Sequence, residues 1–79
     1  MADDQREALP PYQRIAADLR EQIESGRLRP GDMVPSITRL AQEHGVSKGT
    51  AVKALDVLRK EGLTTSVAGW GTFVTERQA

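Results

Sequence analysis

Apolar residues recur at helical spacing near the start of the chain, where a stripe at i, i+3, i+4, i+7 and i+11 consists of Tyr12, Ile15, Ala16, Leu19 and Ile23. One face of a helix has this period, so the pattern predicts an amphipathic helix over about residues 11–25. Pro10 and Pro11 precede the stripe and favour a helix start, and Gly26 is placed to end it. The first predicted element is therefore a helix with one buried face.

The opposite face of this helix is charged. Arg14 with Asp18, and Arg20 with Glu24, have the i, i+4 spacing at which opposite charges attract on a helix surface. Such pairs are typical of a face in contact with water. We therefore expect no functional site on this face.

A second helix is predicted after a short connection. Pro30-Gly31-Asp32 favours a turn, and Met33-Val34 can form a short extended piece before Pro35. Ser36 then offers its hydroxyl as the N-cap of a helix over about residues 37–43. The side chains of this helix that are expected to point inward are Ile37, Leu40 and Ala41.

A third helix is predicted over about residues 48–61, after a turn at His44-Gly45-Val46. Ser47 caps its start and Gly62 stops it. One side of this helix is apolar and should face the core, and it consists of Ala51, Ala54, Leu55 and Leu58. The other side is partly basic, with Thr50 and Val52 at its flanks and, opposite the apolar stripe, Gly49, Lys53 and Lys60.

Two β-prone runs, residues 63–67 and 72–75, follow the third helix. The turn Ala68-Gly69-Trp70-Gly71 joins them and favours a hairpin. Two capped helices joined by a three-residue turn are typical of a helix-turn-helix, whose second helix enters the major groove of DNA, and a hairpin directly after it makes a wing. The predicted fold is mostly α with a small β-hairpin, a three-helix winged helix-turn-helix. The helices alone would also fit an ordinary three-helix bundle.

Length and composition limit the classes of protein that remain. The 79 residues suffice for one domain, expected at residues 10–75, with a disordered lead-in at 1–9 and a tail at 76–79. The sequence has no cysteine, which excludes disulfides and thiolate metal sites, and neither a metal nor a cofactor is expected. We expect no signal peptide, no membrane span and a cytoplasmic location, because the first residues are charged and no long apolar run occurs.

The charge distribution favours a nucleic-acid surface in the C-terminal part of the chain. The formal net charge is zero, but residues 1–46 carry six basic and eight acidic side chains, whereas residues 47–79 carry five basic and three acidic ones. No nucleophile–base pair or phosphate loop is present, so the chain is not predicted to be an enzyme. The one histidine, His44, is expected to cap the second helix.

Several motifs, in their order and spacing, carry a resemblance to a known family. They are Pro35-Ser36, Leu40-Ala41, Gly45-Val46-Ser47, Ala54-Leu55, Glu61-Gly62-Leu63 and Gly69-x-Gly71-Thr72-Phe73-Val74, with Tyr12-x-x-Ile15 and Gly26-x-Leu28-x-Pro30-Gly31-Asp32 before them. They resemble the winged-helix DNA-binding domain of GntR-type bacterial transcription regulators, over residues 9–75. The resemblance implies binding of a double-stranded DNA operator as a dimer, usually for repression.

The sequence departs from the family pattern at three positions where arginine is common, which here hold Thr38, Val52 and Trp70. Lys48 keeps a positive charge at a fourth contact position. A lysine lacks the forked geometry with which arginine binds guanine, so Lys48 is expected to grip phosphate. Arg39 and Lys53 each lie one position from a missing arginine and are candidates to replace it.

The candidate DNA contacts combine both helix caps, the outer side of the third helix and the wing tip. They are Ser36, Thr38, Arg39, Ser47, Lys48, Gly49, Thr50, Val52, Lys53, Gly69, Trp70 and Gly71. Thr50 and Val52 suit a hydroxyl contact and a thymine-methyl contact with bases. Gly49 lowers helix stability relative to alanine. Either this loss is simply tolerated, or the glycine lets the backbone lie close to a base edge. Trp70 is expected to pack under the hairpin, with stacking on a sugar or anchoring of a protein partner as alternatives.

The rival hypothesis is a winged helix that has lost DNA binding and serves as a protein-interaction domain. The zero net charge and the three missing arginines favour it, and Val52 and Trp70 would then be apolar anchors. The salt dependence of binding distinguishes the two hypotheses, because only an affinity that depends on phosphate contacts falls steeply as the salt concentration rises. DNA binding is the preferred prediction, with a DNA operator and a second copy on DNA as partners, and with neither a membrane contact nor a small-molecule pocket.

Overall fold

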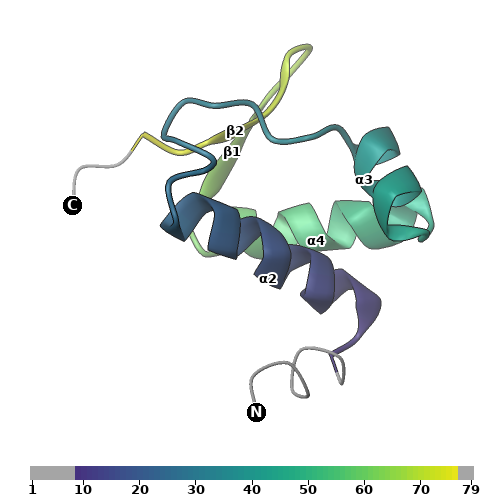
Figure 1. Cartoon of the computed structure of the whole chain (residues 1–79). Coiled ribbons are helices and arrows are strands. Elements are labelled where there is room, and N and C mark those ends of the chain that lie inside the picture. The colour runs from purple at the N-terminus through teal and green to yellow at the C-terminus, as the bar shows by residue number, and fades with distance from the viewer. Residues whose placement is uncertain (1–8, 77–79) are drawn as a thin grey trace.

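The computed structural model describes residues 9–76. Apart from Leu9 and Glu76, the segments expected to form a lead-in at 1–9 and a tail at 76–79 lie outside the described residues. The elements in chain order are the helices α2 (Pro11–Glu24), α3 (Ile37–His44) and α4 (Lys48–Lys60) and the strands β1 (Thr64–Val67) and β2 (Gly71–Val74). Each agrees with its predicted range to within one residue. Three helices followed by an antiparallel hairpin confirm the predicted fold (Figure 1).

The apolar faces predicted from the spacing form one core around α4. Helices α2 and α3 and strand β1 all pack against α4 (Figure 1). The buried apolar residues are Ile15, Ala16, Leu19, Val34, Leu40, Ala41, Ala51, Ala54, Leu55, Leu58 and Val74. The side of α4 that faces away from this core is consequently exposed.

The prediction that Ile37 belongs to the inward face of this helix is wrong, because its side chain is 36% exposed and is not among the buried core residues. A helical side chain covers the turn that precedes its own Cα atom. Ile37 is the first residue of α3, so it has no preceding turn of this helix to cover, and its side chain stays partly exposed. The spacing rule therefore fails at the first position of this short helix.

The connection between α3 and α4 forms as the sequence predicts. The hydroxyl oxygen of Ser36 accepts a hydrogen bond from the amide of Arg39 at 3.1 Å, and that of Ser47 accepts one from the amide of Thr50 at 3.2 Å. Gly45 ends α3 in the left-handed region at φ 65°, which glycine adopts without strain. These local interactions define where α3 ends and where α3 and α4 begin.

The hairpin is stiffened by the chain segment before α3. The register pairs Thr64 with Val74 and Val67 with Gly71, so the two strands are antiparallel. The predicted extended piece is confirmed, since Met33 bridges Phe73 and the amide of Val34 donates to the carbonyl of Thr72 at 2.8 Å. This segment covers the free edge of β2 and ties the wing, residues 64–74, to the helices.

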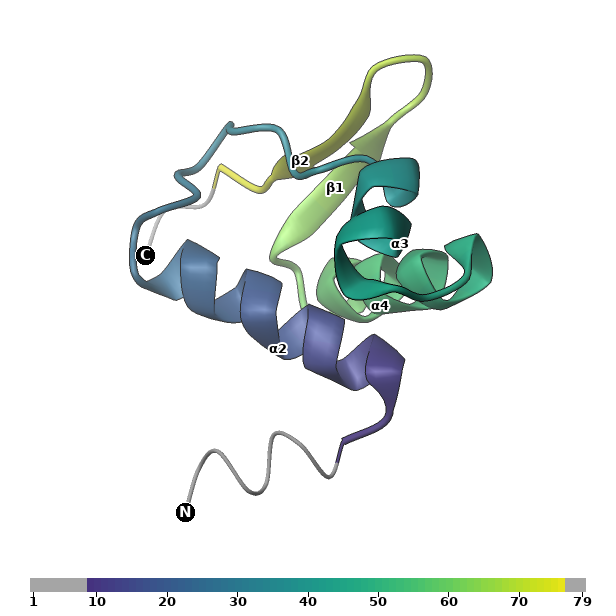
Figure 2. The same cartoon turned by 45° about the vertical axis from the view of Figure 1, so that its right-hand side comes forward.

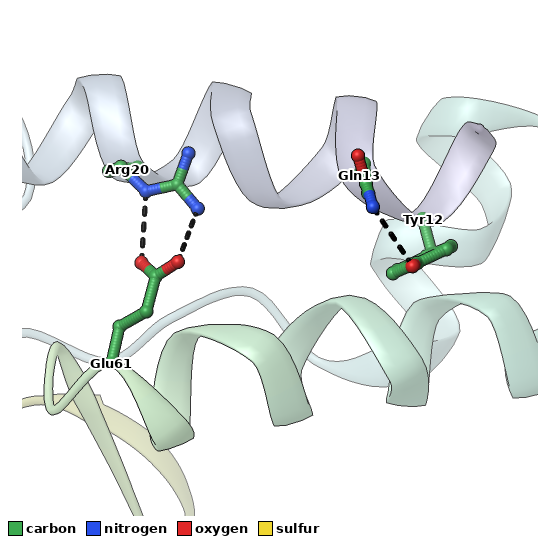
Figure 3. A network of polar contacts seen from close by, with 4 residues as sticks. All are labelled: Tyr12, Gln13, Arg20 and Glu61. Atoms are coloured by element: carbon green, nitrogen blue, oxygen red, sulfur yellow. Dashed lines mark hydrogen bonds and ion pairs between the residues drawn. The ribbon is translucent and has the colours of Figure 1, made fainter. Parts of the chain in front are cut away.

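An ion pair between α2 and the end of α4 replaces one predicted within α2. Arg20 donates from Nε to Oε1 of Glu61 at 3.0 Å and from Nη2 to Oε2 at 2.8 Å (Figure 3). The predicted Arg20–Glu24 pair is therefore wrong, because a two-bond carboxylate contact is stronger than a flexible pair on one helix. The predicted partner of Arg14 is also engaged elsewhere, since Asp18 accepts a hydrogen bond from Gln22 at 3.3 Å.

One hydroxyl group of β1 is buried inside the domain. Thr64 is 3% exposed, and its Oγ1 has no hydrogen-bond partner within residues 9–76. A buried polar group without a partner costs about 1–3 kcal/mol. We expect Thr64→Val, which keeps the shape and removes the hydroxyl, to raise the free energy of unfolding by about 1 kcal/mol in urea denaturation.

Thr65→Val is the matched control, because Thr65 lies next in the same strand with its side chain in water. It makes the same chemical change without relieving a buried polar group. An equal gain in both variants would show that strand propensity, and not the buried hydroxyl, is responsible.

Candidate nucleic-acid interface

The first turn of α4 presents the residues predicted to meet DNA most directly. Ser47, Lys48 and Gly49 are exposed, and Lys48 makes no ion pair with any other part of residues 9–76. Thr50 is half-buried, and its Oγ1 lies 3.1 Å from Oγ of Ser47. The hydroxyl proposed for base contact is thus already held by the helix cap, whereas the Lys48 ammonium is available to a phosphate.

Packing does not explain the glycine in this turn. A Cβ atom added to Gly49 would lie 3.8 Å from Oγ of Ser47 and would meet no other atom within 4 Å. Glycine costs a helix stability relative to alanine, and nothing within the described structure offsets that cost. Of the two explanations for Gly49, close approach of an external molecule is the one that needs a glycine.

Both cations that could replace a missing arginine have partners inside the domain. Arg39 donates from Nε to Oε2 of Glu43 at 2.8 Å, one turn along α3. The ammonium of Lys53 lies 4.5 Å from the centre of the Tyr12 ring, on α2, at a distance where a cation is attracted to the aromatic face. Either side chain must exchange this partner to contact DNA.

The second half of α4 is less basic than its sequence indicates. Asp56 pairs with Arg59 and, at 3.2 Å, with Nζ of Lys60. The hydrogen bond from Arg59, and then that from Lys60, hold the pKa of the Asp56 carboxyl below its usual value, so the group is an anion at neutral pH. One carboxylate thus offsets part of the charge of two cations on the exposed side of α4.

A surface hollow of about 140 Å³ lies where α3, α4 and the wing meet. We call it the α4–wing hollow, and its lining consists of Ile37, Val52, Leu55, Asp56, Arg59, Ser66 and Thr72. Of these residues, only Val52 was predicted as a contact. The others were missed because the hollow depends on how the hairpin sits against α4. The register itself pairs Ser66 with Thr72.

The expectation that Trp70 packs under the hairpin is wrong, because this side chain is 73% exposed. The last strand pair joins Val67 to Gly71, and the amide of Trp70 donates to the carbonyl of Val67 at 2.9 Å. Trp70 therefore belongs to the tight turn beyond the sheet, out of reach of the core. Figure 2 shows this turn projecting away from the three helices. Sugar stacking and a protein contact remain as its alternatives.

The two glycines of the turn have a structural role of their own. Gly69 has a φ of 80° and Gly71 a φ of 129°, backbone conformations that residues with a Cβ atom rarely adopt.

Gly69 and Gly71 are exposed, as are Ser36 and Thr38 at the start of α3. All predicted contact residues are thus on the surface apart from the half-buried Thr50, and they come from the starts of α3 and α4 and from the wing.

Two further hollows border α2 and contain none of the candidate contacts. One, of about 510 Å³, lies between the start of α2 and the end of α3, and the other, of about 290 Å³, lies between α2 and α4. The prediction that the chain has no small-molecule pocket stays a prediction.

In the described part of the chain, no cluster of three or more metal-ligating side chains occurs. The helices of residues 9–76 are also too short and polar to cross a membrane.

Fold and surface together define a winged helix-turn-helix domain. Residues 11–74 match the family model described as bacterial regulatory proteins, gntR family. The chain belongs to this family and forms its winged-helix DNA-binding domain. Because the family consists of regulators, the prediction that the chain is not an enzyme is confirmed.

The relatives are mostly longer than this chain. The mannosyl-D-glycerate transport/metabolism system repressor MngR of Escherichia coli (strain K12) is 42% identical over 69 residues, which cover 87% of this chain and 29% of the repressor. The transcriptional repressor YtrA of Bacillus subtilis (strain 168) is 33% identical over 73 residues, 92% of this chain and 56% of YtrA. The chain thus spans less than a third of MngR and about half of YtrA.

Solved structures of similar domains include complexes with DNA. The DNA-binding domain of AraR, crystallised with operator ORX1, has a TM-score of 0.82 and 37% identity, with 85% of this chain and 81% of that one covered. A putative GntR-family transcriptional regulator has a TM-score of 0.83 and 42% identity, with 94% of this chain and 29% of that one covered. The likeness therefore extends to both the fold and the sequence.

Gly49 generates a prediction in which stability and binding move in opposite directions. We expect Gly49→Ala to raise the free energy of unfolding by about 0.5–1 kcal/mol, since alanine suits a helix better and has room. The same methyl group should weaken binding of a selected DNA duplex about tenfold, the effect of one poor base contact. Thermal unfolding and fluorescence anisotropy measure the two effects.

Gly45→Ala is the contrasting variant, because its φ of 65° makes the same change strained. It should lower stability. If Gly49→Ala gains stability and binds DNA as well as the original chain, the glycine is only tolerated and the close-approach explanation is wrong.

Proposed function

We propose that this chain docks on a double-stranded DNA operator with α4 in the major groove and the wing alongside, as the DNA-binding part of a bacterial transcriptional repressor. The observation that carries this proposal is the likeness to the AraR domain crystallised with operator DNA, at a TM-score of 0.82 and 37% identity. The exposed residues at the starts of α3 and α4 and at the wing tip supply the contact surface. In a helix-turn-helix, the start of the second helix meets base edges.

The proposed roles follow the chemistry of each side chain. Lys48 neutralises a phosphate, and the exposed amides near the Ser36 and Ser47 caps suit phosphate oxygens, because helix starts attract anions. Thr50 and Val52 face base edges, the first with a hydroxyl that the Ser47 cap shares and the second with an apolar surface. Arg39 and Lys53 add phosphate contacts after exchanging their internal partners.

Repression and pairing on DNA are further parts of the proposal. The names of MngR and YtrA describe those proteins as repressors, and repression is carried over to this chain on that basis. A two-fold symmetric operator would receive two copies, one on each half-site, as is common for helix-turn-helix domains. A DNA partner in a bacterium places the proposed site of action in the cytoplasm.

The deciding experiment is selection of duplexes from a random pool, followed by binding titrations at several salt concentrations. We expect enrichment of a two-fold symmetric motif and affinity that falls steeply with salt, because binding releases counterions from the phosphates. If no duplex is retained even at low salt, the proposed function is wrong and the protein-interaction hypothesis is favoured.

Lys48→Ala isolates one phosphate contact. We expect the slope of log affinity against log salt to become shallower by about 0.9 per lost contact, with the same selected sequence still preferred. Arg14→Ala is the control, because Arg14 is an exposed cation on α2 outside the predicted contacts. An equal change of slope in both variants would mean that overall charge, and not a contact at Lys48, sets the salt dependence.

Trp70 tests whether the wing contact is apolar. We expect Trp70→Ala to weaken duplex binding about fivefold at both low and high salt, because sugar stacking involves no counterion. Trp70→Arg should instead make the salt slope steeper by about 0.9, through one added phosphate or groove contact. If DNA affinity is unchanged in both variants, Trp70 serves another partner and the wing contact is wrong.

A further inference from the structure

Three of the residues that line the α4–wing hollow are apolar. Ile37 and Val52, from different helices, stand 36% and 47% exposed and line the hollow together with Leu55, which is buried. Residues exposed in this way lose contact with water only when another molecule covers them. Ile37 and Val52 line the same hollow and are not isolated apolar residues on the surface. This arrangement points to an apolar group of another molecule that enters the hollow.

The charged residues that line the hollow indicate whether the entering group is charged or neutral. Asp56 lines it beside Arg59, to which it is hydrogen-bonded, so the cation is already compensated. A phosphate that entered the hollow would be repelled by the Asp56 carboxylate, and the Arg59 cation would not be free to bind it because it is paired with Asp56. The hollow therefore suits an uncharged base edge and not the DNA backbone.

Only one apolar group projects into the major groove of duplex DNA, and that is the C5 methyl group of thymine. Val52 is the fifth residue of α4, so it lies in the part of this helix that enters the groove under the proposed docking. Ile37 begins α3, directly after the Ser36 cap, and closes the hollow from the other helix. A methyl group that enters the hollow would thus meet apolar lining from both helices.

We propose that the α4–wing hollow receives a thymine methyl group against its apolar lining residues Ile37, Val52 and Leu55, and that this makes the chain select thymine at one position in each half-site. The inference rests on the proposed docking of α4 in the major groove. It assigns a role in specificity to Ile37, whose side chain the helical spacing had placed in the core. Covering one methyl group is worth about a fourfold change in affinity.

The test replaces thymine by deoxyuridine, which removes the methyl group and nothing else. The probe is the tightest duplex selected from a random pool by the chain, with each thymine replaced in turn. We expect binding to weaken about fourfold at one position of each half-site and to change little at the others. In Val52→Ala and Ile37→Ala, the thymine duplex should bind more weakly, and the difference between thymine and deoxyuridine at that position should disappear.

Met33→Ala is the matched control, because Met33 is an exposed apolar side chain outside the hollow. It should keep the full preference for thymine. Duplex binding with equal affinity for thymine and deoxyuridine at every position overturns the inference and leaves the proposed function standing, whereas failure to retain any duplex overturns both. Loss of self-association in Val52→Ala, with the thymine preference intact, would also overturn it and assign the hollow to a second copy of the chain.

Discussion

The tight contact of α4 with its neighbours is the constraint on which the rest of this domain depends. Ala51 and Ala54 are completely buried on the inner side of α4, and α2 and α3 both pack against that helix. Small side chains let helix backbones approach closely, and a larger residue at either position would have to push a neighbouring helix away. Because the inner side is fixed in this way, the orientation of the outer side is fixed as well. A recognition helix needs this property, since its contacts with bases demand a defined geometry.

The ion pairs of the domain explain how a chain with no net charge can still favour an anionic partner. Glu61 is occupied by Arg20 on the side of α2, and Asp56 offsets Arg59 and Lys60 on α4. Exposed pairs of this kind add little to stability, but they determine which cations remain available. At the start of α4, Lys48 has no such partner within the described residues. The zero sum of formal charges therefore does not show that a cation such as Lys48 stays available to an anionic partner.

Features set by local sequence were predictable, and features set by distant contacts were not. The Ser36 and Ser47 caps and the left-handed Gly45 depend on residues within one turn of the chain, so the helix ends followed from the sequence. The exposure of Ile37 could not be derived from spacing, because the helix end removes the surface that this side chain would cover. The Arg20–Glu61 pair and the α4–wing hollow require elements far apart in sequence to be placed side by side, which periodicity does not specify.

At two positions where the resemblance to the family implies arginine, this chain has the apolar residues Val52 and Trp70, which under the proposed docking changes the physical basis of recognition. Arginine attracts DNA over about one Debye length, roughly 8–10 Å at moderate salt, and so raises the rate of encounter. In the proposed interface, Val52 and Trp70 would act only in direct contact, where shape and water exclusion determine the energy. A domain built in this way gains less from general attraction to DNA and more from a fitting base edge. Under the proposed docking, the ratio of specific to non-specific affinity would then depend mainly on short-range contacts, and the exposed apolar surface of α4 would help to select the DNA sequence.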